Sequence, residues 1–159
     1  MPPRETTLED LAASLPKRGR LMGLDLGTKT IGLALSDVER RIASPFEVIR
    51  RKKFALDAEI LMRRIKEHDI QALVVGLPLS LDGAEGPRVQ ATRAFMRNLS
   101  AFAPPPHVYW DERMSTAVVT RALIAQDASR ARRAEVVDRM AAAYILQGAL
   151  DRLARLVSD

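Results

Sequence analysis

The sequence predicts an α/β domain in which helices cover both faces of one mixed β-sheet. Three short apolar strands with turn residues between them come first in the chain, and strands then alternate with helical segments. Strands of the first kind form an antiparallel meander, whereas strands separated by helices pair in parallel through crossover connections. The length of 159 residues suits one domain, which we place at residues 20–157.

The predicted meander occupies residues 21–49. Leu21–Leu26 is an apolar run closed by the turn Gly27–Lys29, and Ile31–Leu35 returns beside it as a hairpin. Ile42–Ile49 extends the meander, and Pro45 within it marks an edge strand or a bulge because proline cannot donate to a β-ladder.

After the meander, predicted helices alternate with predicted strands, and two helices end the chain. Apolar residues spaced by four, three and four positions from Phe54 to Ile65 predict an amphipathic helix. Ile70–Val75 is a mostly apolar run, typical of a strand covered on both faces. The later elements are predicted as a helix over Val89–Phe102, a strand over Val108–Glu112, and helices over Ser115–Gln126 and Ala134–Val157.

Residues 1–19 differ in character from the rest. They have no sustained apolar period and contain three prolines and a glycine. We therefore predict a mobile N-terminal tail, with at most one weak turn around Leu8–Leu15. Its acidic residues and the absence of an apolar h-region argue against a secretory signal.

Composition narrows the class of protein. The chain has no cysteine, which excludes disulfides and thiolate metal sites and fits the reducing cytoplasm where we expect the protein. No apolar run approaches the ~18 residues of a membrane span. The formal net charge of +5 and the pI near 10.1 suit a polyanionic partner, although such an excess is also common among soluble proteins.

Carboxylates in three segments of the chain are candidates for chemistry, and each also has a local structural explanation. Asp25 lies inside an apolar strand, where an unpaired charge is costly, although an Asp bonded to the following turn would explain it equally well. Asp111 and Glu112 end the strand that begins at Val108, where a helix cap is the alternative. Asp138 stands near the start of the last helix, where the helix dipole alone could explain it.

Taken together, these carboxylates suggest a metal site. A central strand, a neighbouring strand end and a packed helix could bring Asp25, a carboxylate of the pair Asp111 and Glu112, and Asp138 to one place. Their hard oxygen ligands would suit one or two Mg²⁺ or Mn²⁺ ions. Two such ions could activate water against a phosphodiester. The two histidines, His68 and His107, leave little for a zinc site.

The sequence also resembles a known family, the YqgF/RuvX proteins. Six blocks match in family order: Gly23–Asp37; Ala43–Pro45; Val74–Leu79; Asp82-Gly83 with Glu85–Arg88; Asp111–Thr116; and Asp138–Ala142 with Ile145–Gln147. The resemblance implies a three-layer RNase H-like fold with a mixed five-stranded sheet, an antiparallel meander plus two parallel strands. It also implies a nuclease that matures the 5′ end of the 16S rRNA precursor, related to Holliday junction resolvases.

The resemblance implies site residues as well. The catalytic and metal-binding set becomes Asp25, Glu112 and Asp138, with Asp111 as a further contributor. Thr30 stands where the family usually has arginine, and Met114 where it usually has leucine. The cations nearest the acidic set in sequence, Lys29, Arg88 and Arg113, are the first candidates for nucleic-acid contacts. Two clusters lie further away along the chain: Arg50–Lys53, and Arg130 with Arg132 and Arg133.

Several functions stay open on the sequence. The substrate is precursor ribosomal RNA, presented alone or in pre-ribosomal particles, or else branched DNA, because both present phosphodiesters to the same carboxylates. A non-catalytic RNA-binding assembly factor would bind without metal-dependent turnover. The Asp-x-Gly-Thr hairpin also resembles the phosphate loop of actin-like ATP-binding folds, which need a second domain. The oligomeric state is not predicted.

Overall fold

The protein is described by a computed structural model covering residues 4–80, 82–114 and 130–158. For residues 130–138 and 158 only the helical backbone is described. The segment 115–129, where the sequence predicts a helix over Ser115–Gln126, lies outside the described residues.

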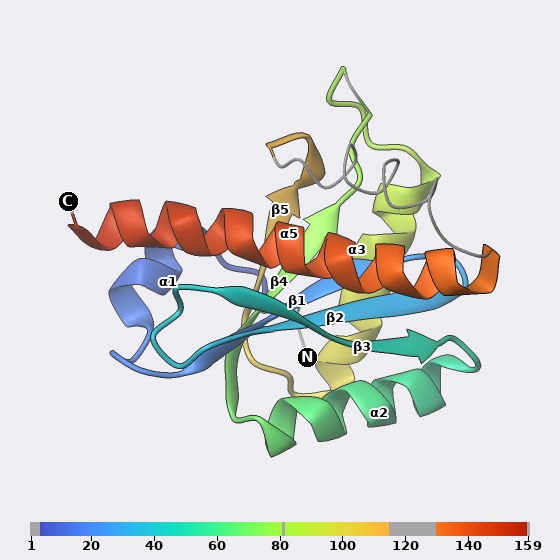
Figure 1. The fold of residues 1–159 in the computed structure, drawn as a ribbon, viewed down its shortest axis with the longest axis horizontal. Helices are drawn as coiled ribbons and strands as arrows, with labels where there is room; N and C mark the ends of the chain where they lie inside the picture. Colours follow the sequence, from blue (N-terminus) through green and yellow to red (C-terminus); the bar gives the residue numbers. More distant parts are fainter. Residues whose placement is uncertain (1–3, 81, 115–129, 159) are drawn as a thin grey trace.

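One five-stranded sheet forms the centre of the structure (Figure 1). Its strands are β1 (Arg20–Leu26), β2 (Thr30–Ser36), β3 (Ala43–Arg50), β4 (Ile70–Leu77) and β5 (His107–Asp111), in the order β3-β2-β1-β4-β5. β1, β2 and β3 pair antiparallel, while β4 pairs in parallel with both β1 and β5. The predicted mixed sheet is confirmed.

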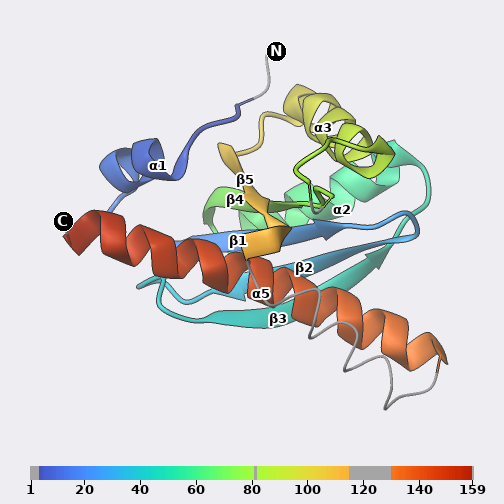
Figure 2. The same cartoon turned by 90° about the horizontal axis from the view of Figure 1, so that it is seen from above.

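Helices cover both faces of this sheet (Figure 2). α2 (Phe54–Glu67) and α3 (Pro87–Leu99) lie on one face, and the long helix α5 (Arg130–Ser158) crosses the other. Short 3₁₀ turns follow α3 at Ser100–Phe102 and β5 at Glu112–Met114. Within the described ranges, α5 included, no helix combines the length and apolar character needed to cross a membrane.

Strand alternation divides the apolar core between the two faces. In β1, Met22 and Leu24 pack with α2 and α3, whereas Leu21 packs with α5. In β5, Val108 and Trp110 belong to the α5 side, and Tyr109 packs on the opposite side. This two-residue period therefore fixes the face on which each charged side chain lies.

Pro45 marks both an edge and a bulge. β3 is the outermost strand, and its pairing with β2 shifts from Leu33↔Glu47 to Ala34↔Pro45. One residue of β3 therefore has no counterpart on β2, as in a β-bulge. Pro45 therefore lies in an edge strand and at a bulge, and both interpretations of the sequence are confirmed.

The N-terminal segment differs from the mobile tail predicted for residues 1–19. Residues 8–14 form helix α1 (Leu8–Ser14), capped by the Thr7 side chain, which accepts from the Asp10 amide. Leu11 is 1% exposed and packs in the core beneath the end of α5. Upstream, the Thr6 amide donates to the His107 carbonyl at 2.8 Å. A helix of two turns is too short to show its apolar period clearly, and tertiary contact with α5 stabilises it.

His107, where this segment meets β5, has a perturbed pKa. Its side chain is buried, and the loss of solvation lowers the pKa from 6.5 to about 4. Between these values the unfolded chain binds a proton that the folded chain does not, so the free energy of unfolding decreases as the pH falls from 6.5 towards 4. By pH ~5 the loss should reach roughly 2 kcal/mol.

His107→Leu should remove this part of the acid sensitivity, as read from urea unfolding midpoints near neutral and mildly acidic pH. His68→Gln is the matched control, because His68 is only half-buried at the end of α2. A His107→Leu protein with the full wild-type pH dependence would contradict the assignment.

Candidate active site

Asp25 lies on the α5 face of the sheet, near the carboxyl end of β1. It follows Gly23 by two residues, so both point to the same face. A Cβ added at Gly23 would lie 2.7 Å from the Ala142 carbonyl oxygen and 2.8 Å from the Leu146 Cβ. α5 therefore contacts the backbone of β1 directly at this point. Asp25 is 5% exposed, so its carboxyl group lies beneath this helix rather than in open solvent.

Glu112 reaches the same face from the end of β5. Its Cδ would lie 3.4 Å from a Cβ added at Gly76, and the Ile145 side chain of α5 is closer still. The absence of a side chain at Gly76 makes room for this carboxyl group between β4 and α5. Glu112 is 4% exposed. Alternation along β5 gives the same face, that of Val108 and Trp110.

The strand register brings Asp25 and Glu112 towards each other. Leu24 pairs with Val75, so the next positions, Asp25 and Gly76, lie side by side on β1 and β4. Since the Glu112 carboxyl lies over Gly76, two buried carboxyl groups flank one glycine on the same face. This arrangement follows from two parallel strands ending at the same edge of the sheet.

Asp138 belongs to α5, one turn before Ala142. Further along α5, the Gln147 side chain accepts a hydrogen bond from the Ala43 amide. Ala43 pairs with the last residue of β2, and the end of β2 lies beside the start of β1, so this part of α5 lies near the start of β1. Towards its own N-terminus, α5 thus runs from the start of β1 past Gly23 in the direction of Asp25 (Figure 1). The Asp138 side chain lies outside the described part of the chain. Among the side chains that are described, no three potential metal ligands cluster.

Asp111 lies on the opposite face, with Tyr109, and is paired with Arg113. The Arg113 Nη2 is 2.6 Å from the Asp111 Oδ2, and the Arg113 amide donates to the Oδ1 at 3.0 Å. The hydrogen bond from Arg113 lowers the pKa of the Asp111 carboxyl. The structure therefore separates Asp111 from Asp25 and Glu112.

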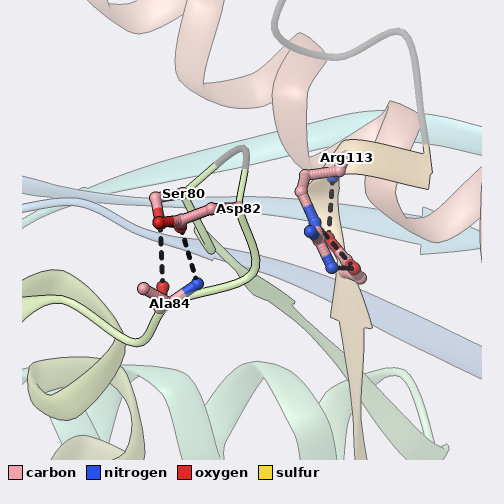
Figure 3. A network of polar contacts seen from close by, with 5 residues as sticks. Ser80, Asp82, Ala84 and Arg113 are labelled. Atoms are coloured by element: carbon pink, nitrogen blue, oxygen red, sulfur yellow. Dashed lines mark hydrogen bonds and ion pairs between the residues drawn. The ribbon is translucent and has the colours of Figure 1, made fainter.

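Arg113 also approaches the loop between β4 and α3, since a Cβ added at Gly83 would lie 3.3 Å from its Nη1. Figure 3 shows this loop and Arg113. The Ser80 hydroxyl and the Ala84 amide both donate to the Asp82 carboxyl, and the Gly83 amide donates to the Ser80 carbonyl at 2.8 Å. The hydrogen bond from Ser80 is the main cause of the lowered pKa of Asp82. Arg113, predicted as a phosphate contact, thus has a structural partner in Asp111 beside this closed turn.

The other predicted cations fall into two groups. Lys29, at the tip of the β1–β2 hairpin, and Arg88, in the first turn of α3, are both exposed. Arg88 borders a depression that Arg51 also lines, so an arginine from the sequence-distant cluster Arg50–Lys53 lies close to the hairpin. Sequence distance alone had placed that cluster away from the acidic set. The side chains of Arg130, Arg132 and Arg133 fall outside the described residues.

The chemistry of the donor set suits a divalent cation. Two carboxyl groups, each about 95% buried on adjacent strands, are costly to ionise unless a cation or further polar groups compensate the charge. Carboxylate oxygens are the ligands that Mg²⁺ and Mn²⁺ prefer. Asp25 and Glu112 therefore fit such an ion, and Asp138 is placed on the helix that covers them.

The chain is similar to known proteins over most of its length. The family model described as "RuvX: Holliday junction resolvase" matches residues 19–152. A Methylocella silvestris protein named "Putative pre-16S rRNA nuclease" is 65% identical over 150 residues, covering 94% of this chain and 93% of that protein. A protein of the same name from Rhodobacter capsulatus is 57% identical over 149 residues, covering 94% of both.

The alignment with the first of these relatives extends into the N-terminal segment. Since 140 residues follow Gly19, an alignment of 150 residues includes at least ten of the first 19. Among solved structures, Thermus thermophilus RuvC in complex with a Holliday junction substrate has a TM-score of 0.54 at 13% identity, covering 84% of this chain and 95% of that one. At this identity the likeness shows the RuvC-like fold alone.

Proposed function

The chain belongs to the RuvX family, and from this premise we propose that it is a divalent-metal-dependent nuclease that matures the 5′ end of the 16S rRNA precursor. The observation that carries the proposal is the pair of buried carboxyl groups, Asp25 and Glu112, on one face of the sheet. The names of the relatives support the choice of ribosomal RNA as the substrate.

The proposed catalytic set is Asp25, Glu112 and Asp138. These carboxylates would hold one or two Mg²⁺ or Mn²⁺ ions. When bound, such ions lower the pKa of water and stabilise the charge on a leaving oxygen. Asp25 would contribute its carboxylate from β1, the central strand of the sheet, which is paired on both sides. Glu112 contributes from the end of β5, over Gly76.

The surrounding residues hold these groups in place. Ile145 packs over Gly76 and excludes water from that side of Glu112. Arg113, by pairing with Asp111, fixes the chain on the far side of Glu112. A site whose side chains are held by packing and hydrogen bonds loses less free energy to reorganisation during the reaction. Lys29 and Arg88, exposed near the carboxyl end of β1, would contact substrate phosphates.

Branched DNA is the second candidate substrate. The description of the matching family and the RuvC-like fold both favour it.

The deciding experiment compares substrates and metals. We would incubate the full chain with a precursor 16S rRNA fragment or a four-way DNA junction, in the presence of Mn²⁺, Mg²⁺ or a chelator. We expect metal-dependent cleavage of the RNA. Cleavage of the junction alone would select the resolvase function. RNA binding without cleavage under any condition would instead identify a non-catalytic assembly factor.

A further inference from the structure

We propose that the junction between the β1–β2 hairpin and α3 is a seat for one backbone phosphate of the bound nucleic acid, formed by Arg51 and Arg88 with Lys29 beside it. The inference rests on the proposed function in one respect, because the strand held there is the strand presented to Asp25. It adds Arg51, which sequence position does not connect with the site.

The seat is a small depression at the end of β1. It is lined by Leu26, Gly27 and Thr28 from the hairpin, by Arg51, and by Arg88, Ala91, Thr92 and Phe95 from α3. No acidic side chain is among these lining residues. Gly27 follows Asp25 by two residues, about 7 Å along the chain. The depression lies on the α3 side of the sheet and Asp25 on the α5 side, so a single nucleic-acid strand would contact both places by crossing the carboxyl end of β1.

The backbone at Arg51 is fixed from both sides. Its own amide donates to the Lys29 carbonyl at 2.8 Å, which ties it to the hairpin turn. The next amide, of Lys52, donates to the buried Asp57 carboxyl at 3.0 Å, which ties it to the first turn of α2. Arg51 is thus pre-positioned, and binding a ligand there would cost little backbone entropy.

The guanidinium group of Arg51 is also oriented. Its Nη1 donates to the Gly27 carbonyl, and its Cζ lies 5.4 Å from the centre of the Phe95 ring. Within the described residues this is the hydrogen bond that the group makes, so several of its five N–H donors remain for a ligand. A planar guanidinium with fixed orientation matches the paired oxygens of a phosphodiester better than an ammonium does.

Arg88 is the reason to assign a phosphate site here rather than a purely structural role for Arg51. Arg51 alone could serve only to join the hairpin to α3. The Arg88 side chain, however, is exposed and makes no hydrogen bond or ion pair with any described residue. The side-chain hydrogen bond at this residue, from the Thr92 hydroxyl, goes to its backbone carbonyl. Two guanidinium groups that border one depression without a carboxylate raise the local positive potential, which favours an anionic ligand.

The test measures the salt dependence of RNA binding by full-length protein carrying Asp25→Asn, so that the RNA stays intact. The probe is a short fluorescent single-stranded RNA, followed by anisotropy over a range of salt concentrations. Each lost phosphate contact should reduce the slope of log affinity against log salt by about 0.7. We expect Arg51→Gln and Arg88→Gln each to reduce the slope, equally for RNAs of different sequence, because phosphate contacts carry no base information.

Arg63→Gln is the matched control. Arg63 is an exposed cation on α2, paired with Glu59 and outside the depression, so its loss should leave the slope unchanged. Arg51→Lys keeps the charge and should retain most of the slope. If both Arg51→Gln and Arg88→Gln keep the wild-type slope of log affinity against log salt, the proposal is wrong. It is also wrong if only Arg51→Gln changes the slope and this variant unfolds at a lower urea concentration, because Arg51 then acts on stability. Cleavage by the wild-type protein is scored separately, so failure of the nuclease proposal is distinguishable from failure of the seat.

Discussion

Asp25→Asn is expected to reduce metal-dependent cleavage of the precursor rRNA by about a thousandfold while leaving the fold intact. Removing one charged ligand weakens the electrostatic stabilisation of the reaction by several kcal/mol, and about 4 kcal/mol corresponds to that factor. Asparagine has nearly the shape of aspartate, so the packing beneath α5 should survive the change. Single-turnover cleavage rates, with urea unfolding midpoints as the check on folding, measure the effect.

Asp111→Asn is the matched control for this prediction. Asp111 is one residue from Glu112, but it lies on the other face of the sheet and is paired with Arg113. We expect this variant to retain activity within about tenfold, since it disturbs a positioning contact worth roughly one hydrogen bond to a charged group. Equal losses in the two variants would contradict the placement of the site on the α5 face, and full activity in Asp25→Asn would exclude Asp25 from the reaction.

Gly23→Ala is expected to destabilise the protein and to reduce cleavage beyond the loss of folded molecules. The added methyl group would lie 2.7 Å from the Ala142 carbonyl oxygen and 2.8 Å from the Leu146 Cβ, neither of which can move without α5. Overpacking of this kind costs about 1–3 kcal/mol. Because α5 also carries Asp138, a shift of the helix should move that carboxylate relative to Asp25. Urea midpoints and cleavage rates of the folded protein separate the two effects.

Gly86→Ala provides the comparison for Gly23→Ala. Gly86 precedes α3 with φ of −85°, and a Cβ added there meets nothing within 4 Å. Gly86 is the N-cap of α3, where alanine is less favourable than glycine, so we expect the free energy of unfolding to fall by no more than about 1 kcal/mol, with no loss of cleavage. A similar effect of both substitutions would mean that close contact with α5 is not what requires glycine at position 23.

Local sequence pattern was sufficient for much of the sheet and for part of the site. Short apolar runs bounded by turn residues predict β1, β2, β4 and β5 within two residues of their observed ends. Alternation along β5 places Asp111 and Glu112 on opposite faces, because side chains in a strand point to alternate sides whatever the rest of the chain does. Pro45 marks the edge and the bulge of β3 for an equally local reason, the missing amide hydrogen.

Contacts between distant segments required the tertiary structure. α1 is too short to be recognised without α5, against which Leu11 is buried. Nothing in the sequence connects Arg113 with Asp111 as an ion pair rather than with substrate, or brings Arg51 to the carbonyl of Gly27. Local pattern thus sufficed to assign the strands, to find the carboxylates among apolar neighbours and to place Asp111 and Glu112 on opposite faces. Which charges meet is a property of the assembled fold, because pairing depends on the register and close approach of elements far apart in the chain.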